Sequence, residues 1–404
     1  MKKSIFTATL IAAFALSALA LAACSDEPAP AYSEISSEAP TEEPTQSEEE
    51  IMLESMTLEQ KAAQTVVAGL SYTYVDEDFE ALAERGLGGA ILFSSNITDS
   101  QQLVELTNSI KGCAGEIPIL IGMDEEGGAV TRLPDDVLSM PSAYTIASSD
   151  DTRYCYSAGV NLGNQLRAFG LSTGFSPVLD IWSNPDNTVI GERAFGTTAE
   201  EVCSYGIAEL EGIMSTGEVA VAKHFPGHGD TEVDSHYGLP VVTKSLEELE
   251  QMEFLPFEAA IERGIPGIMV GHILCENIDP DEPASLSKTM VTDILKGELG
   301  FEGVVFTDDL TMGAISEKYT PAEAGVKALD AGCDMLLICF GYDNANETID
   351  LIIDSVESGD LSEERLDDAV LNILRMKSSG AVTSAAVQQP DIQSLNELTA
   401  EFWE

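Results

Sequence analysis

Basic side chains are scarce in this sequence. Its 404 residues include 19 lysines and arginines against 70 aspartates and glutamates, which gives a net charge of −51 at pH 7. Nine of the acidic residues lie between positions 25 and 50, so the rest of the chain is itself strongly acidic. A protein that binds nucleic acid or an anionic membrane surface needs clustered positive charge. We therefore expect no nucleic acid and no anionic lipid surface among its partners.

Sequence motifs for bound cofactors are also missing. The six cysteines other than Cys24 form no close C-x-x-C pair. Several lie in apolar segments, where a free thiol packs as a small hydrophobic side chain. No glycine-rich dinucleotide or phosphate-binding motif follows the first strand-like segment. We expect no cofactor.

The first residues have the features of an export signal. Lys2 and Lys3 precede an apolar, alanine-rich run that is short for a membrane span and is followed at once by polar sequence. The run ends in Leu21-Ala22-Ala23-Cys24, which resembles the bacterial lipobox, whose cysteine is acylated and becomes the first mature residue. The alternative is an ordinary signal peptide with an unrelated cysteine. We expect residues 1–23 to be a lipoprotein signal peptide, and acylated Cys24 to anchor the exported protein to the bacterial cell membrane, facing outward.

Residues 24–50 predict a tether. After Cys24 they contain proline, serine and acidic residues, with no lysine or arginine. Such a segment cannot bury enough apolar surface to offset the entropy lost on ordering. Proline and the repulsion between like charges keep it extended. We expect a disordered acidic segment that gives the folded domain reach.

Eight short apolar segments recur along the rest of the chain, each bounded by glycine or polar residues. They are AQTVVAG (63–69), GGAILFS (88–94), PILIGMD (118–124), STGFSPV (172–178), EVAVAKH (218–224), PGIMVGH (266–272), GVVFTDD (303–309) and CDMLLIC (333–339). Most are separated by text with helical periodicity, and four capping-box patterns mark helix starts. Apolar strands that alternate with helices predict a parallel sheet covered on both faces. We expect an α/β fold, a TIM-like (β/α)8 barrel forming a single catalytic domain over residues 51–380, followed by a C-terminal tail over 381–404; a doubly wound open sheet is the alternative.

Reactive side chains gather where these segments end. They are Asp124, Asp180, Lys223, His224, His272 and Asp308. A hydrophobic core does not tolerate so many ionisable groups. The loops that follow the strands of a parallel barrel, in contrast, converge over one mouth. This distribution favours the barrel and predicts a site at the carboxyl ends of its strands.

Three of the four histidines fall within 13 residues, in VAKHFPGHGDTEVDSHYGLP (221–240). Histidine and aspartate are common metal ligands, so a metal site competes with an acid/base and substrate-binding site. The H-x3-H-x7-H spacing matches no compact metal motif, and Lys223 beside His224 would repel a cation. We expect no metal here.

Asp234-Ser235-His236 suits proton transfer. Residues i and i+2 of an extended loop point the same way, so the Asp234 carboxylate can accept a hydrogen bond from one nitrogen of His236. That contact fixes the tautomer and raises the basicity of the other nitrogen, which can then donate a proton and take one back. The alternative is a histidine that is simply satisfied within a polar loop.

Four separated motifs resemble glycoside hydrolase family 3. ILKGELGFEGVVFTDDLT (294–311) is similar to its active-site signature, which has two aliphatic residues, a basic residue, an acidic residue, glycine, three apolar residues and then Ser/Thr-Asp. KHFPGHGDTEVDSH (223–236) resembles the hallmark of the β-N-acetylglucosaminidase branch. MDEEGGAVTRLP (123–134) and GERAFG (191–196) complete a resemblance that covers the chain from about Ile51 to Arg375.

The resemblance implies roles by position. Asp308, which by itself would equally suit a helix N-cap, would be the nucleophile, with His236 as general acid/base and Asp234 as its orienting partner. Ala129 stands where relatives carry a basic residue, which leaves the contacts at the entrance in doubt. Residues that hold the sugar hydroxyls and the N-acetyl group would be Asp124, Arg132, Arg193, Lys223 and His224.

The implied activity is that of a retaining exo-β-N-acetylglucosaminidase of the β-hexosaminidase type. Its carbohydrate substrate would carry a terminal β-linked N-acetylhexosamine, as in cell-wall muropeptides or chitin-type oligomers, and would form a covalent glycosyl-enzyme with Asp308. Another family 3 β-glycosidase activity, or a β-N-acetylglucosaminide phosphorylase, is the nearest alternative. A solute-binding lipoprotein would share the anchor and tether but would need no nucleophile motif.

Overall fold

Short parallel strands form the centre of the structure, a computed structural model that describes residues 46–231 and 238–403. These residues belong to one folded unit, Gln46–Glu404. The strands are β1 (Val66–Gly69), β2 (Gly89–Leu92), β3 (Leu120–Met123), β4 (Val221–Phe225), β5 (Val241–Val242), β6 (Gly267–Val270), β7 (Leu274–Cys275), β8 (Val304–Thr307) and β9 (Leu336–Ile338). One sheet has the order β3-β2-β1-β9, a second has the order β4-β6-β8, and β5 pairs with β7. Seven of the eight expected segments therefore contain strands, and the α/β class with parallel sheets is confirmed.

The fourth expected segment, 172–178, is not a regular strand. Isolated parallel bridges join Thr173 to Gly122 of β3 and Val178 to Lys223 of β4, so the segment runs between these two strands. Its backbone leaves the extended conformation at Phe175, where φ is +44°, and Pro177 has no N–H to donate to a ladder. The apolar pattern identified the position of this segment correctly but not its conformation.

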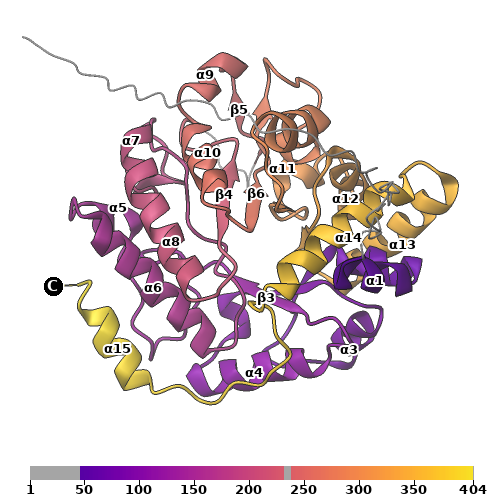
Figure 1. The fold of residues 1–404 in the computed structure, drawn as a ribbon, viewed down its shortest axis with the longest axis horizontal. Helices are drawn as coiled ribbons and strands as arrows, with labels where there is room; N and C mark the ends of the chain where they lie inside the picture. The colour runs from indigo at the N-terminus through magenta and orange to yellow at the C-terminus, as the bar shows by residue number, and fades with distance from the viewer. Residues whose placement is uncertain (1–45, 232–237, 404) are drawn as a thin grey trace, which may run out of the picture. The chain divides into compact units, whose positions relative to one another are not determined.

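Helices lie around the strands (Figure 1). The α-helices are α1 (Glu48–Ser55), α2 (Leu58–Gln64), α3 (Glu77–Glu84), α4 (Ser100–Gly112), α5 (Ala143–Ala147), α6 (Thr152–Ala168), α7 (Ala199–Glu201), α8 (Ile207–Ser215), α9 (Leu246–Glu250), α10 (Leu255–Glu262), α11 (Gly313–Ser316), α12 (Pro321–Ala331), α13 (Tyr342–Ser358), α14 (Glu363–Ser378) and α15 (Ile392–Ala400). Turns of 3-10 helix are η1 (Ser94–Asn96), η2 (Gly191–Arg193) and η4 (Ala284–Leu286), and π-helical segments are η3 (Val202–Gly206) and η5 (Thr289–Glu298).

All four expected capping boxes are present. In each, the side chain of the N-cap residue accepts from the backbone N–H three residues later, and the side chain at that position accepts from the N-cap N–H, which satisfies two otherwise unpaired donors. They begin α2, α7, α9 and α12, at Thr57 with Gln60, Thr198 with Glu201, Ser245 with Glu248, and Thr320 with Glu323.

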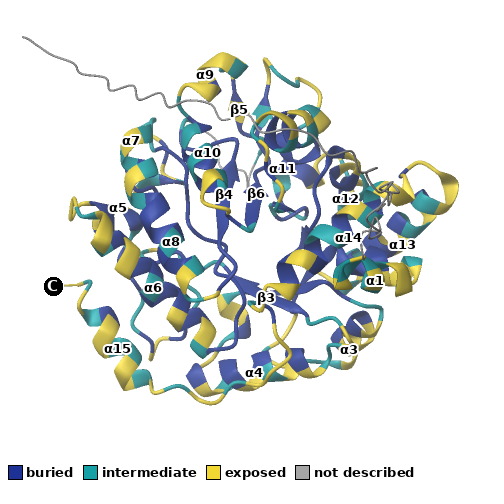
Figure 2. Ribbon diagram, viewed as in Figure 1, coloured by how far each residue is buried: buried dark blue, intermediate teal, exposed yellow. Residues whose placement is uncertain are grey.

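The strands of the two larger sheets are buried on both faces (Figure 2). In β1, Val66 and Ala68 belong to the larger apolar cluster, which the strands share with the helices, whereas Val67 belongs to a second cluster. Alternate residues of a strand point to opposite faces, so the second cluster lies on the face that the strands turn away from the helices. Strand residues of this cluster also include Ile91, Leu120, Val221, Met269, Val304, Phe306 and Leu337.

The last turns of α14 close the amino-terminal end of the strands. Ile373 and Met376 pack into the second apolar cluster. The buried Lys377 ammonium donates to Gly88 O at 2.7 Å, just before β2, and to Gln64 Oε1 at 2.9 Å, just before β1. Burial lowers the pKa of Lys377 to about 7. Because α14 covers the amino-terminal ends of the strands, their carboxyl ends are the ones open to a ligand.

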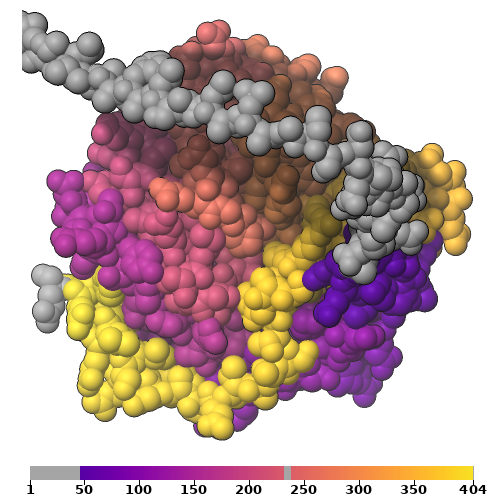
Figure 3. All heavy atoms as spheres, viewed as in Figure 1, coloured from indigo at the N-terminus to yellow at the C-terminus, as the bar shows by residue number. Residues whose placement is uncertain are grey.

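Two boundaries differ from the sequence analysis. Helix α1 begins at Glu48, inside the expected tether, because Ser47 and Glu50 form a further capping box. The expected C-terminal tail contains α15 and runs over the surface past α4 and α6 (Figure 3). Asn161 and Gln165 of α6 both donate to Thr399 Oγ1 at 2.9 Å.

The predicted lipidation residue, Cys24, lies outside the described residues. Within the part of the chain that the structure describes, no helix has the length and apolar character needed to cross a membrane.

Candidate active site

Four strand ends surround a cavity of about 150 Å³. Asp124 follows β3, Lys223 and His224 belong to β4, and Asp308 follows β8, whereas β6 contributes Met269 to the wall. Because the strands are parallel, their carboxyl ends open at the same end of the fold. The structure brings together six of the predicted site residues here: Asp124, Arg132, Arg193, Lys223, His224 and Asp308. Two others, Asp234 and His236, lie outside the described residues.

A network of ion pairs forms the polar wall of the cavity. Lys223 Nζ donates to Asp124 Oδ1 at 2.8 Å and lies 2.7 Å from Glu126 Oε1. Arg193 donates to both carboxylate oxygens of Glu126, at 2.7 and 2.8 Å. Burial alone would raise the pKa of Glu126, but the Arg193 and Lys223 cations outweigh it and hold this pKa below its usual range. Glu126 therefore stays ionised and balances the two cations that face the cavity.

His224 is held by a buried carboxylate. Its Nδ1 lies 2.6 Å from Oδ2 of Asp180, a residue with no exposed surface, and its backbone N–H donates to the same oxygen. Burial raises the pKa of Asp180, but the effect of His224 is larger and opposite, so the net pKa of Asp180 is lowered. An ionised Asp180 requires a proton on Nδ1, which leaves Nε2 of His224 facing Arg193 Nη2 at 3.5 Å.

His228, the second of the three clustered histidines, contacts Asp180 and Thr231. Its N–H donates to Asp180 Oδ1 at 2.6 Å, and its Nδ1 lies 2.7 Å from Thr231 Oγ1. Burial and the nearby His224 lower its pKa. Asp180 thus links both histidines, which explains why a carboxylate follows the 172–178 segment.

Asp308 faces the cavity from the end of β8. Its backbone N–H donates to Val270 O at 3.0 Å, and its Oδ1 accepts from the Asp309 N–H at 2.8 Å. Burial raises the pKa of Asp308, but the positive charges of His272 and His224 outweigh this effect and the net pKa is lowered. An ionised carboxylate therefore stands beside the ion-pair network.

Asp309 is the structural member of the aspartate pair. Its Oδ1 accepts from the N–H groups of Thr311 and Cys339, at 2.9 and 3.1 Å, and its Oδ2 accepts from Thr311 Oγ1 at 2.6 Å. The Asp309 carbonyl lies 2.9 Å from Nε2 of His272. These contacts occupy Asp309 and His272 in holding the loop after β8, so Asp308 is the carboxylate left free to react.

Two site residues were not identified from the sequence, although both lie in the MDEEGG motif. Glu126 forms the ion-pair network described above. Glu125 Oε2 accepts from Arg132 N at 2.7 Å and from Thr131 Oγ1 at 2.9 Å, which positions the loop that carries Arg132. Burial raises the pKa of Glu125 to about 7. The sequence feature that could have identified them is the pair of adjacent acidic residues directly before two glycines.

A second hollow opens beside the first. It has a volume of about 410 Å³ and shares Asp124, Arg132, Met269 and Asp308 with the polar cavity.

Among the described residues, no three His, Cys, Asp or Glu side chains are grouped as metal ligands.

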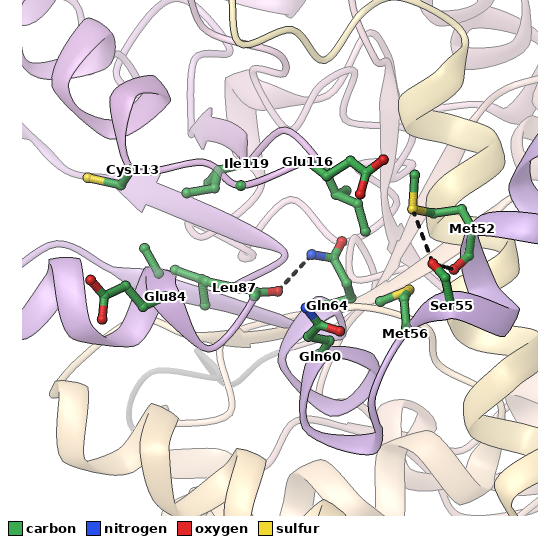
Figure 4. A pocket seen from close by; sticks show the side chains of 14 residues that line it. Met52, Ser55, Met56, Gln60, Gln64, Glu84, Leu87, Cys113, Glu116 and Ile119 are labelled. Atoms are coloured by element: carbon green, nitrogen blue, oxygen red, sulfur yellow. Dashed lines mark hydrogen bonds between the residues drawn. The ribbon is translucent and has the colours of Figure 1, made fainter.

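A separate pocket lies at the amino-terminal ends of the strands, away from these groups. It measures about 380 Å³, and its wall includes Gln64 before β1, Leu87 before β2 and Ile119 before β3 (Figure 4). Gln64 Nε2 donates to Gly86 O at 2.7 Å in this wall. Its lining lacks the histidines, lysines and arginines that gather at the carboxyl ends.

Comparison with known proteins gives the family of this chain. Residues 57–376 match the model of the glycosyl hydrolase family 3 N-terminal domain. A "Beta-hexosaminidase" from Nitrosomonas eutropha is 37% identical over 289 residues, which cover 70% of this chain and 82% of that protein. "Beta-hexosaminidase A" from Pseudoalteromonas piscicida is 31% identical over 334 residues, which cover 76% of this chain but only 56% of that protein. The structure of a family 3 β-N-acetylglucosaminidase from Paenibacillus sp. strain FPU-7 superposes with a TM-score of 0.81 at 38% identity, covering 86% of this chain and 68% of that one.

Proposed function

This chain is a glycoside hydrolase of family 3, and from that premise we propose that it is a retaining exo-β-N-acetylglucosaminidase. The observation that carries the proposal is the cavity in which ionised Asp308 faces a fixed network of hydrogen-bonding and charged groups. Lys223 and Arg193 can donate to sugar hydroxyls or to an acetamido group, and Asp124 and Nε2 of His224 can accept from them. A cavity with polar groups on several sides suits the terminal sugar of a chain.

In the first step, Asp308 attacks the anomeric carbon of the bound sugar. The bond between that carbon and the leaving oxygen breaks, and His236 gives its proton to that oxygen. The product is a covalent glycosyl-enzyme that retains the sugar as an ester of Asp308. The lowered pKa of Asp308 supports this role, because only the ionised carboxylate is nucleophilic.

In the second step, water takes the place of the departed group. His236 removes a proton from the water, whose oxygen attacks the anomeric carbon and breaks the ester to Asp308. Two successive displacements leave the anomeric configuration unchanged. Asp234 orients His236 through both steps, so that one imidazole serves first as acid and then as base.

The catalytic experiment compares 4-nitrophenyl β-N-acetylglucosaminide with the β-glucoside, each with and without phosphate. We expect the N-acetylglucosaminide to be preferred and water to be the acceptor. Asp308→Ala should lower kcat by several orders of magnitude because covalent catalysis is lost. Asp368→Ala, which changes an exposed aspartate on α14, is the matched control and should be fully active. Activity that requires phosphate would instead identify a phosphorylase, and an active Asp308→Ala enzyme would refute the nucleophile assignment.

We also propose that the strands close into one (β/α)8 barrel. The bridges at Thr173 and Val178 connect β3 to β4, and a further bridge between Phe306 and Met335 connects β8 to β9. With the two sheets, these links supply every junction of a ring. A crystal structure that lacked one of these junctions would contradict the closed ring.

Outside the described residues, we propose that residues 1–23 are removed and that acylated Cys24 holds the enzyme on the outer face of the bacterial cell membrane. The support is the sequence Leu21-Ala22-Ala23-Cys24 followed by the acidic tether. Surface-held glycans with terminal N-acetylglucosamine, such as muropeptides or chitin-type oligomers, would then be the accessible substrates.

A further inference from the structure

The larger hollow beside Asp308 differs in chemistry from the polar cavity. Its volume of about 410 Å³ lies within the range of ligand-binding pockets. Where the two spaces meet they share Asp308, but the far wall of the larger one contains Phe93, Met312, Leu337 and Phe340. A ligand that extends from Asp308 into this hollow therefore meets apolar side chains as well as polar ones, which are Asp124, Arg132, Asp309 and Thr311.

Two phenylalanine rings form the outer part of this wall. Phe93 follows β2 and Phe340 follows β9, the two strands that flank β1 in the sheet. Their ring centroids lie 5.6 Å apart with the planes inclined by 18°, so the rings are stacked. The intervening strand ends at Gly69, which has no side chain to place between them.

Phe340 is 63% exposed, more than the other large hydrophobic side chains of the described residues. Single exposed apolar residues are common on protein surfaces. Phe340 differs from that situation because its ring stacks on that of Phe93 and because it lines a hollow that also contains Asp308. Its exposed area is therefore available beside the proposed site.

A β-linked N-acetylglucosamine ring suits such a surface. Its ring substituents are equatorial, so its axial C–H groups form an apolar face that packs on the electron-rich face of an aromatic ring. The polar cavity already suits the terminal sugar, which needs hydrogen-bonding partners on several sides. The larger hollow shares Asp308 with the polar cavity and is therefore the adjoining space for the remainder of the substrate.

We propose that the Phe93–Phe340 pair binds the sugar ring on the leaving-group side of the scissile bond, with β-linked N-acetylglucosamine as the occupant. The inference rests on the proposed function and adds a second sugar-binding subsite to it. Phe340 contributes the exposed stacking surface, and the ring of Phe93 stacks against it. The pair therefore determines how well the enzyme distinguishes a glycan from a glycoside with a small leaving group.

The test compares kcat/KM for di-N-acetylchitobiose and for methyl β-N-acetylglucosaminide, which has no leaving-group ring. Phe340→Ala should lower the ratio of the two values by about two- to tenfold, the range that an aromatic contact contributes. Phe340→Leu should lower it similarly, because it keeps apolar area but not a flat ring, whereas Phe340→Tyr should keep the ratio near that of the wild type. Tyr156→Ala, at an exposed tyrosine on the outer side of α6, is the control and should leave the ratio unchanged.

The outcomes separate this inference from the proposed function. If the wild type cleaves both substrates and Phe340→Ala leaves the ratio unchanged, the second subsite is refuted while the activity stands. If the wild type cleaves neither substrate, the proposed function fails and the subsite falls with it. A fall in the ratio for Tyr156→Ala as large as that for Phe340→Ala would also overturn the inference.

Discussion

Glu126 lies between two cations in a space with almost no solvent. The side chain of Lys223 is 2% exposed and that of Glu126 is 4% exposed, and Arg193 binds both oxygens of the same carboxylate. Removing one member of a buried ionic group leaves the others charged and desolvated, which costs more than the interaction itself contributed. The site therefore depends on this carboxylate for folding as well as for shape.

Glu126→Gln should lower the free energy of unfolding by roughly 3–5 kcal/mol at pH 7. Because pairing lowers the pKa of Glu126 in the folded state, its stabilisation is full above its ordinary pKa of 4.5 and is lost as the pH falls below that value toward the folded pKa. Urea unfolding at pH 7 and at pH 4 measures both effects, and the variant should lose less stability on acidification than the wild type. Glu192→Gln, at an exposed neighbour of Arg193, should change neither quantity.

His236→Ala tests proton transfer to the leaving group. A natural disaccharide needs its leaving oxygen protonated, so we expect its kcat/KM to fall about 10²–10⁴-fold. An aryl glycoside with a good leaving group needs little protonation and should lose far less. Asp234→Asn should show the same contrast in weaker form, because the imidazole remains but its orientation is lost. Equal losses on both substrates, together with a lower melting temperature, would point to a structural role instead.

Residue identities at the site were predictable where they followed an apolar segment. Two of these residues directly follow a strand, Asp124 after β3 and Asp308 after β8, and Lys223 and His224 lie near the end of β4. A strand pattern is therefore enough to place them together. Glu126 and the supporting role of Asp180 were not predictable in this way. Their function depends on which cation or imidazole reaches them across the site, and that is a property of the folded structure.

Helix α15 shows how an element can be missed. Its segment is short, and the sequence analysis described it only as part of a tail. Its place is determined by apolar contacts of Ile392 and Leu395 with the core and by side-chain hydrogen bonds, among them those of the fully buried Thr399. The 172–178 segment shows the opposite case, because its apolar pattern is clear but Phe175 and Pro177 prevent a regular strand.

Thr399→Val tests this anchoring. The valine has the shape of threonine but cannot accept hydrogen bonds, so the amide groups of Asn161 and Gln165 would remain buried without their partner. Each such group costs about 1–3 kcal/mol, and we expect the free energy of unfolding to fall by about 2–4 kcal/mol. Glu397→Ala, on the exposed side of the same helix, is the control. A Thr399→Val protein as stable as the control, by chemical denaturation, would contradict a structural role for α15.

At the scale of the whole molecule, the alternation of apolar segments with helices predicted the α/β class and the end of the fold that carries the site. What it could not predict was which strands pair through full ladders and which through single bridges, since backbone hydrogen bonding depends on local φ and on proline rather than on hydrophobicity. The boundaries near residue 50 and beyond residue 380 differ for another reason, because side-chain hydrogen bonds at Ser47 and at Thr399 order these segments.

Cys24→Ala should release the protein from the membrane. The wild type should partition into detergent and begin, when its mature N-terminus is sequenced, at a blocked cysteine. The variant should appear in the soluble fraction with its activity on an aryl glycoside intact, because the change lies far along the sequence from the site residues. A wild-type protein that is already soluble and is cleaved elsewhere would rule out the anchor.

The closure of the amino-terminal strand ends by α14 has a kinetic consequence. Because Ile373, Met376 and Lys377 fill that end, a sugar reaches the polar cavity from the carboxyl end of the strands. The sugar held deepest enters first and leaves last, so its departure must wait until the leaving-group side is empty. A polymer therefore does not pass through the site, and after every cleavage the shortened chain must dissociate and rebind. Free N-acetylglucosamine should therefore act as a competitive inhibitor that occupies the same chamber as the substrate.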